Sequence, residues 1–151
     1  MKHMLISLTG SLILIMTSLT LFGQDDSQFL TYRQKLMQSN ATHMGAIGQI
    51  MQKGLPFKSH VSSHATVIQQ NSMLFEEAWK KKITDGKTDS KPEVWTNWAG
   101  FVNAAKASSN AAAELARAGE GQMMDKMRAL GGTCGSCHRN FRKPKSQRFK
   151  R

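Results

Sequence analysis

The chain has 151 residues, with 21 Lys and Arg against 10 Asp and Glu, which gives a formal net charge of +11. This length suits one ordinary domain with a single hydrophobic core. Only two cysteines are present, so a zinc site built from two Cys pairs is excluded.

The N-terminus has the pattern of a secretory signal peptide. Met1–His3 is a short basic start, Met4–Phe22 is mostly apolar with Ser and Thr interspersed, and the sequence turns polar after Gly23. This order is typical of a signal peptide with a small residue at its cleavage site. We therefore expect residues 1–23 to be removed and the protein to be periplasmic. The alternative is an uncleaved membrane anchor, because the apolar stretch is nearly long enough to span a bilayer.

The first predicted helix runs from about Ser27 to Gln52. Asp26 or Ser27 can cap its N-terminus, and Gly54-Leu55-Pro56 ends it. Residues at spacings of three, four and seven form one stripe along it, namely Leu30, Arg33, Met37, Met44, Ile47 and Met51.

Two further helices are predicted before the C-terminal region. The second runs from about Ser59 to Ile83, and the third starts with Ser90 as cap and Pro92 in its first turn and continues to about Ala118. Their inward-facing side chains are Val61, Ala65, Ile68, Phe75 and Trp79 on the second, and Val94, Trp95, Trp98, Phe101, Val102 and Ala105 on the third.

The fourth predicted helix runs from about Gln122 to Lys143. Gly131-Gly132 interrupts its pattern, through either a break in the helix or a close approach to a bound group. No alternating strand pattern occurs. Four helices with short connections predict an all-α, antiparallel up-down-up-down bundle. In that topology the first and fourth helices are neighbours, so the first helix covers one face of any group bound to the fourth.

The fourth helix contains the sequence Cys134-Gly135-Ser136-Cys137-His138, which is the attachment pattern of a c-type haem. Positions three apart share one helix face, so both thiols can form thioethers with one porphyrin. His138 is then the proximal iron ligand. The alternatives are a disulfide and half of a zinc site, while a thioredoxin-like motif lacks its βαβ context. We expect one covalently bound haem c.

The C-terminal end is strongly basic. Seven of the Lys and Arg residues lie in Arg139–Arg151, and residues 144–151 form a basic tail. On an exported protein this charge suggests an acidic redox partner or an anionic membrane surface rather than nucleic acid. A solvated tail without a partner is the alternative, and the same choice applies to Lys80–Lys82.

The whole mature chain resembles the cytochrome c-prime family, the class II c-type cytochromes, and residues 24–143 form the resembling bundle. The matching segments are Tyr32-Arg33-Gln34-x-x-Met37, Lys53-Gly54, Lys91-Pro92-Glu93-Val94-Trp95 and Cys134-x-x-Cys137-His138-x-x-Phe141-Arg142. The resemblance implies a four-helix bundle that encloses one covalent haem.

The resemblance also implies roles for single residues. Cys134 and Cys137 match the haem-attaching cysteines and His138 the axial ligand. Arg33 matches an arginine near a haem propionate, and Arg142 matches one beside the proximal face. Met37 falls over the distal face, where a bonded thioether gives a low-spin electron carrier and an unbonded side chain leaves five-coordinate iron. Some gas-binding members also have methionine there.

We therefore expect a periplasmic electron carrier rather than an enzyme, with a binder of nitric oxide or carbon monoxide as the alternative. A peroxidase would need acid–base groups beside vacant iron, and only His43 on the first helix is near. Met44 is two turns from Met37, about 10 Å along the axis, so one iron cannot meet both. His60 and His64 on the second helix are further candidates for reaching the haem, with solvated positions on the polar helix face as the alternative. Homodimers through the first two helices are common in the family, and the sequence does not decide between dimer and monomer.

Overall fold

The computed structural model describes residues 25–149. The helices in chain order are α1 (Asp26–Gln52), α2 (His60–Met73), α3 (Phe75–Lys80), α4 (Glu93–Thr96), α5 (Trp98–Ala116) and α6 (Met123–Phe141), with 3-10 turns η1 (Glu120–Gln122) and η2 (Lys145–Gln147). Between residues 25 and 149 there is no strand, only one isolated bridge between Ser90 and Arg142. The predicted signal peptide, residues 1–23, lies outside the described residues.

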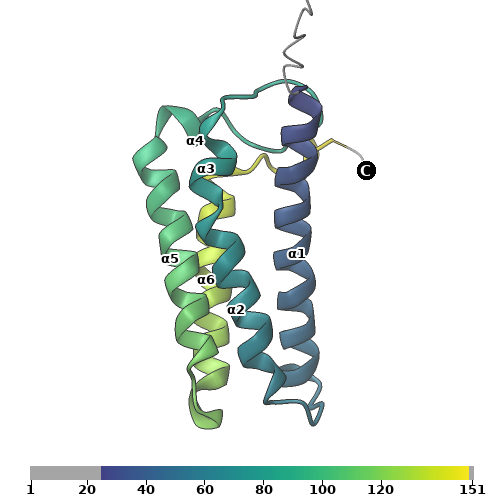
Figure 1. Cartoon of the computed structure of the whole chain (residues 1–151), viewed down its shortest axis with the longest axis vertical. Coiled ribbons are helices and arrows are strands. Elements are labelled where there is room, and N and C mark those ends of the chain that lie inside the picture. Colours follow the sequence, from purple (N-terminus) through teal and green to yellow (C-terminus); the bar gives the residue numbers. More distant parts are fainter. Residues whose placement is uncertain (1–24, 150–151) are drawn as a thin grey trace, which may run out of the picture.

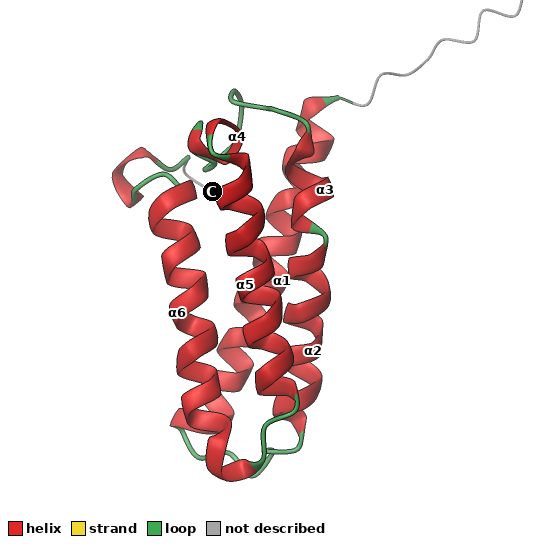
Figure 2. Ribbon diagram, turned by 90° about the vertical axis from the view of Figure 1, so that its left-hand side faces the viewer, coloured by secondary structure: helices red, strands yellow, loops and turns green. Residues whose placement is uncertain are grey.

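The long helices run side by side as an antiparallel four-helix bundle (Figures 1 and 2), which confirms the predicted fold class. The second rod of the bundle consists of α2 followed by α3, and the third of α4 followed by α5. Among residues 25–149, no helix combines the length and the apolar character needed to cross a membrane.

Two of the predicted helices are interrupted in the structure. The second helix was expected to be continuous to Ile83, but it is interrupted at Leu74 and ends at Lys80. There, the guanidinium of Arg33 donates hydrogen bonds to the carbonyl oxygens of Ala78 and Lys81, at N–O distances of 2.7 and 2.6 Å. The third helix breaks at Asn97, whose side chain accepts a hydrogen bond from the amide of Gly100 at 3.1 Å and so caps α5.

Two predicted caps are also corrected. Asp25, not Asp26 or Ser27, caps α1, because its carboxylate accepts the amide of Ser27 at 3.1 Å. Ser90 does not cap the third helix. Its hydroxyl instead accepts the indole N–H of Trp79 at 3.0 Å. The α6 helix runs unbroken through Gly131-Gly132, and it covers Met123–Phe141 rather than Gln122–Lys143.

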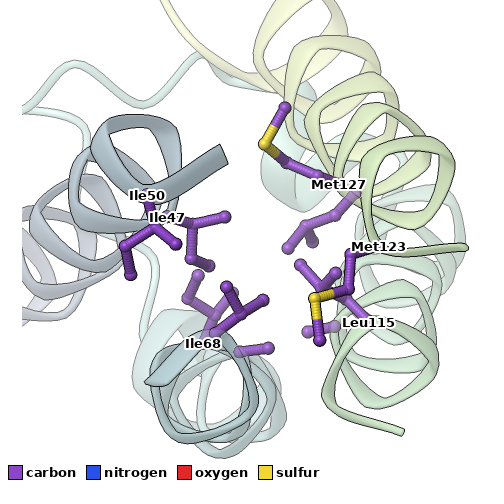
Figure 3. Packing of buried hydrophobic residues seen from close by; sticks show 10 residues of the cluster. Ile47, Ile50, Ile68, Leu115, Met123 and Met127 are labelled. Carbon is purple, nitrogen blue, oxygen red and sulfur yellow. The ribbon is translucent and has the colours of Figure 1, made fainter. Parts of the chain in front are cut away.

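The core has two parts along the bundle. At one end, aliphatic side chains from four helices meet (Figure 3), and Ile47, Ile68, Leu115 and Leu130 are fully buried there. The other part is aromatic and includes Cys137, together with Leu36, Phe75, Trp79, Val94, Phe101, Ala105 and Phe141. The haem motif lies where the two parts meet, because Cys134 packs against the aliphatic part and Cys137 belongs to the aromatic one.

Helix packing leaves α1 and α6 separated. The α1 helix packs mainly on α2, and α6 packs mainly on α5. A cavity lies between the facing sides of α1 and α6 and is lined by both. The first and fourth rods of the bundle therefore form the two walls of one chamber, as the topology predicted.

Candidate haem site

The cavity has a volume of about 430 Å³, and most of the surface that faces it is apolar although polar side chains also line it. Aromatic rings from α3, α5 and α6 form much of its wall, with Trp79 and Phe101 6.0 Å apart and Phe101 and Phe141 5.5 Å apart between ring centroids. All six site residues predicted from the sequence line this one cavity, namely Arg33, Met37, Cys134, Cys137, His138 and Arg142.

The two thiols come from consecutive turns of α6 and are not joined in a disulfide. Cys137 is buried and Cys134 is half-buried. Burial raises the pKa of the Cys137 thiol to about 11, with the neighbouring Cys134 adding to the effect, and burial also raises the pKa of Cys134. Both sulfurs therefore stay protonated at neutral pH and border an apolar cavity instead of bulk water.

His138 follows directly on Cys137 and lines the same cavity. Its pKa is lowered, first because burial disfavours the imidazolium and then because Arg142 and Arg148 bring positive charge nearby. A neutral imidazole is the form that binds a metal. The electrostatics around His138 therefore favour the ligating form at neutral pH.

Arg33 is the most informative residue on the α1 side. Its side chain is only 3% exposed, yet it carries a guanidinium whose Nη1 atom has no hydrogen-bond partner. The other nitrogens bond the carbonyls of Ala78 and Lys81, and the guanidinium lies 5.5 Å from the ring of Trp79. Burial lowers the pKa of Arg33, but a guanidinium stays charged in proteins. An unpaired, buried N–H beside the cavity fits an anion such as a haem propionate.

Met37 and Met44 both line the cavity but at different levels. Met37 packs against the aromatic cluster that contains Cys137, whereas Met44 packs against the aliphatic cluster that contains Leu130. Because α1 and α6 are antiparallel, Met37 is the methionine level with the Cys137–His138 end of the motif.

Arg142 lies where the chain leaves α6, and its Nη2 bonds a carboxylate oxygen of Asp89 at 3.2 Å. The other oxygen of Asp89 accepts the amide of Phe149 at 3.3 Å. Phe149 itself lines the cavity. The described part of the C-terminal tail, residues 144–149, is thus folded against the loop before α4. Arg148 and Phe149 are half-buried there, whereas residues 144–147 are exposed to solvent.

Sequence reasoning missed Asp89 and Phe149 as parts of the site. Asp89 is an unremarkable loop residue in sequence, and its contacts are with residues 53 and 60 positions away. Conversely, three histidines weighed as candidates, His43, His60 and His64, are absent from the cavity lining. His43 turns to His64 instead, so it is not placed as an acid–base group beside a haem.

The residues present fit a covalently bound haem. Two thiols three residues apart suit two thioether bonds, and the adjacent imidazole suits the iron. The unpaired buried Nη1 of Arg33 suits a propionate, and the apolar rings suit the macrocycle.

Comparisons with known proteins agree with this chemistry. Residues 28–142 match the family model described as cytochrome c'. The chain is 29% identical to the cytochrome c' of Rhodospirillum rubrum over 147 residues, which covers 94% of this chain and 99% of that protein.

Two solved structures share the fold. The cytochrome c prime from Shewanella frigidimarina superposes with a TM-score of 0.73 at 21% identity, covering 80% of this chain and 98% of that one. A nitric oxide complex of a mutant cytochrome c prime from Alcaligenes xylosoxidans superposes with a TM-score of 0.70 at 22% identity, covering 80% and 98%. The family match spans most of the chain, and the chain therefore belongs to the cytochrome c' family, whose members carry one covalently attached haem c.

Proposed function

We propose that this protein is a periplasmic single-electron carrier. In this proposal Cys134 and Cys137 hold the haem, His138 is the proximal ligand and Met37 is the distal ligand. The observation that carries it is the position of Met37 across the cavity at the level of Cys137, with Met44 displaced toward the aliphatic core.

The haem supplies one-electron redox chemistry when bound. The chain supplies ligands, burial and charge. Neutral His138 and the soft thioether of Met37 form the ligand pair that raises the reduction potential in c-type cytochromes. Arg33 would place positive charge beside a haem propionate, and Trp79, Phe101 and Phe141 would keep water from the macrocycle.

The positive charge of the protein indicates the kind of redox partner that it would meet. The sequence has a net charge of +11, and positive surface potential accelerates encounter with an acidic protein. We propose an acidic redox partner, with contact to an anionic membrane surface as the weaker alternative. A homodimer through α1 and α2 remains an expectation from the family resemblance.

A gas-binding function is the second candidate. A cytochrome c prime has been solved as a nitric oxide complex and shares this fold. In that case Met37 covers the distal face without a bond, and the iron is five-coordinate and open to small gases.

Replacing single methionines tests the proposal. Met37→Ala should convert ferrous low-spin protein to high-spin and speed the binding of carbon monoxide, because the gas no longer displaces a ligand. Met44→Ala is the matched control: it removes the same side chain from the same cavity wall seven residues away, so the iron should stay low-spin. Low-spin iron that persists in Met37→Ala would point to another ligand and overturn this assignment.

A further inference from the structure

The histidines outside the haem motif have an arrangement that the electron-transfer proposal does not use. The sequence has five histidines. His3 lies outside the described residues and His138 belongs to the haem site. The remaining three are His43 on α1 and His60 and His64 on α2, and two of them, His43 and His64, meet where these two helices pack.

His43 and His64 face each other across the helix interface. Their Nδ1 atoms are 2.8 Å apart, and their ring centroids are 5.1 Å apart. Both side chains are half-buried, so their nitrogens are held by packing while solvent still reaches the pair. In the metal-free state one neutral ring can donate its N–H to the other.

The neighbouring contacts fix this separation. The amide of Asn71, two turns after His64, donates to the Oδ1 of Asn40 and the Oγ of Ser39, about one turn before His43, each at 2.9 Å. Ile47, one turn after His43, and Ile68, one turn after His64, are fully buried in the aliphatic core. Two nitrogen donors on two rigid helices are therefore preorganised.

The 2.8 Å separation also suits a shared metal ion. With metal–nitrogen bonds of about 2.0–2.1 Å, two nitrogens 2.8 Å apart subtend about 84–89° at the metal. That is the cis angle of a square-planar or tetragonal ion. A tetrahedral zinc ion would require the nitrogens to be about 3.3–3.4 Å apart.

The neutral form of His64 is favoured by its surroundings. Burial lowers the pKa of His64, and positive charge on His43 and His60 would lower it further. His64 is thus predominantly neutral at pH 7, which is the form a metal requires.

We propose that His43 and His64 form a binding site for a tetragonal divalent transition-metal ion, of which Cu²⁺ is the best match. Cu²⁺ favours square-planar nitrogen and oxygen ligands and binds such sites more tightly than the other first-row divalent ions. Water fills the remaining positions. His60 is not a ligand, because its ring is stacked on Phe57 with centroids 5.2 Å apart.

This site is separate from the haem cavity, because neither His43 nor His64 lines it. The inference therefore does not depend on whether Met37 binds the iron.

The test uses the ferric holo-protein from the periplasm, without an affinity tag, titrated with Cu²⁺ alone. We expect one equivalent to bind, with an EPR signal split by two imidazole nitrogens. His43→Gln and His64→Gln should each weaken binding at least about tenfold, as loss of one ligand from a two-ligand chelate requires. The haem absorption spectrum should be unchanged in every variant, which reports that fold and haem ligation are intact.

A matched variant makes the result decisive. His60→Ala removes a histidine from the same helix and should leave Cu²⁺ affinity nearly unchanged. The proposal is overturned if the double variant of His43 and His64 binds Cu²⁺ as tightly as wild type. It is also overturned if His60→Ala abolishes binding while His43→Gln does not, because the chelate is then the i,i+4 pair on α2.

Discussion

Replacing Asp89 with Ala should release the C-terminal segment from the haem cavity. One carboxylate oxygen accepts a hydrogen bond from the guanidinium of Arg142 at 3.2 Å, and the other accepts one from the backbone amide of Phe149 at 3.3 Å. The Asp89 side chain is 13% exposed and that of Arg142 29%. A hydrogen bond to a charged group contributes about 1.5–3 kcal/mol, and these two are long and partly exposed. We therefore expect Asp89→Ala to lower the free energy of unfolding by about 2 kcal/mol.

The assay is urea unfolding together with limited trypsin digestion. Trypsin should cleave after Lys145 and Arg148 faster in Asp89→Ala than in wild type, because the segment no longer packs against the loop. Asp89→Asn keeps one acceptor for Phe149 and should lie between them.

The matched control for Asp89 is an exposed ion pair. Glu120 lies 2.8 Å from Lys58, with side chains 68% and 55% exposed, and such pairs contribute about 0.2–1 kcal/mol. Glu120→Ala should therefore lower the free energy of unfolding by less than Asp89→Ala does, and it should leave the tryptic pattern unchanged. If Asp89→Ala and Glu120→Ala prove equal in both assays, Asp89 does not anchor the segment and this reasoning fails.

Three other predictions follow from the site and the surface. Replacing both Cys134 and Cys137 with Ser should leave the haem extractable by acid-acetone or prevent holo-protein from accumulating, so a haem-stained band on a denaturing gel of the double variant would contradict covalent attachment. Electron transfer to an acidic partner should slow as salt rises, because the Debye length falls from about 30 Å at 0.01 M to about 10 Å at 0.1 M; a rate indifferent to salt would refute electrostatic steering. The pKa of His64 is lowered below its ordinary value of 6.5, so the unfolded chain binds a proton more readily than the folded protein. The contribution of His64 to the free energy of unfolding should therefore be full above pH 6.5 and be lost as the pH drops through the lowered value. In urea unfolding, His64→Gln should lose less stability than wild type over this pH range, and an equal loss would exclude His64 as the cause.

The haem motif could be predicted from the sequence because its chemistry is local. The spacing of Cys134, Cys137 and His138 is itself the attachment geometry on a helix. Arg33 and Met37 required the family resemblance, since a single arginine or methionine on a helical stripe is more often a packing residue. The structure adds the physical reason for Arg33, a buried guanidinium with one unpaired nitrogen.

What sequence reasoning missed depends on contacts between distant residues. The break at Asn97 arises because its side chain competes locally for the amide of Gly100, a cap that the apolar pattern conceals. The role of Asp89 and the pairing of His43 with His64 depend on which loops and helices meet in space. A periodic pattern identifies a helix face but not its partner residue.

The central claim is that Met37 and His138 together ligate the haem iron of an electron carrier. The most direct measurement is the visible absorption spectrum of the ferrous wild-type protein at neutral pH. This account predicts a six-coordinate, low-spin spectrum that carbon monoxide changes only slowly. A high-spin ferrous spectrum would contradict methionine ligation and favour the gas-binding function.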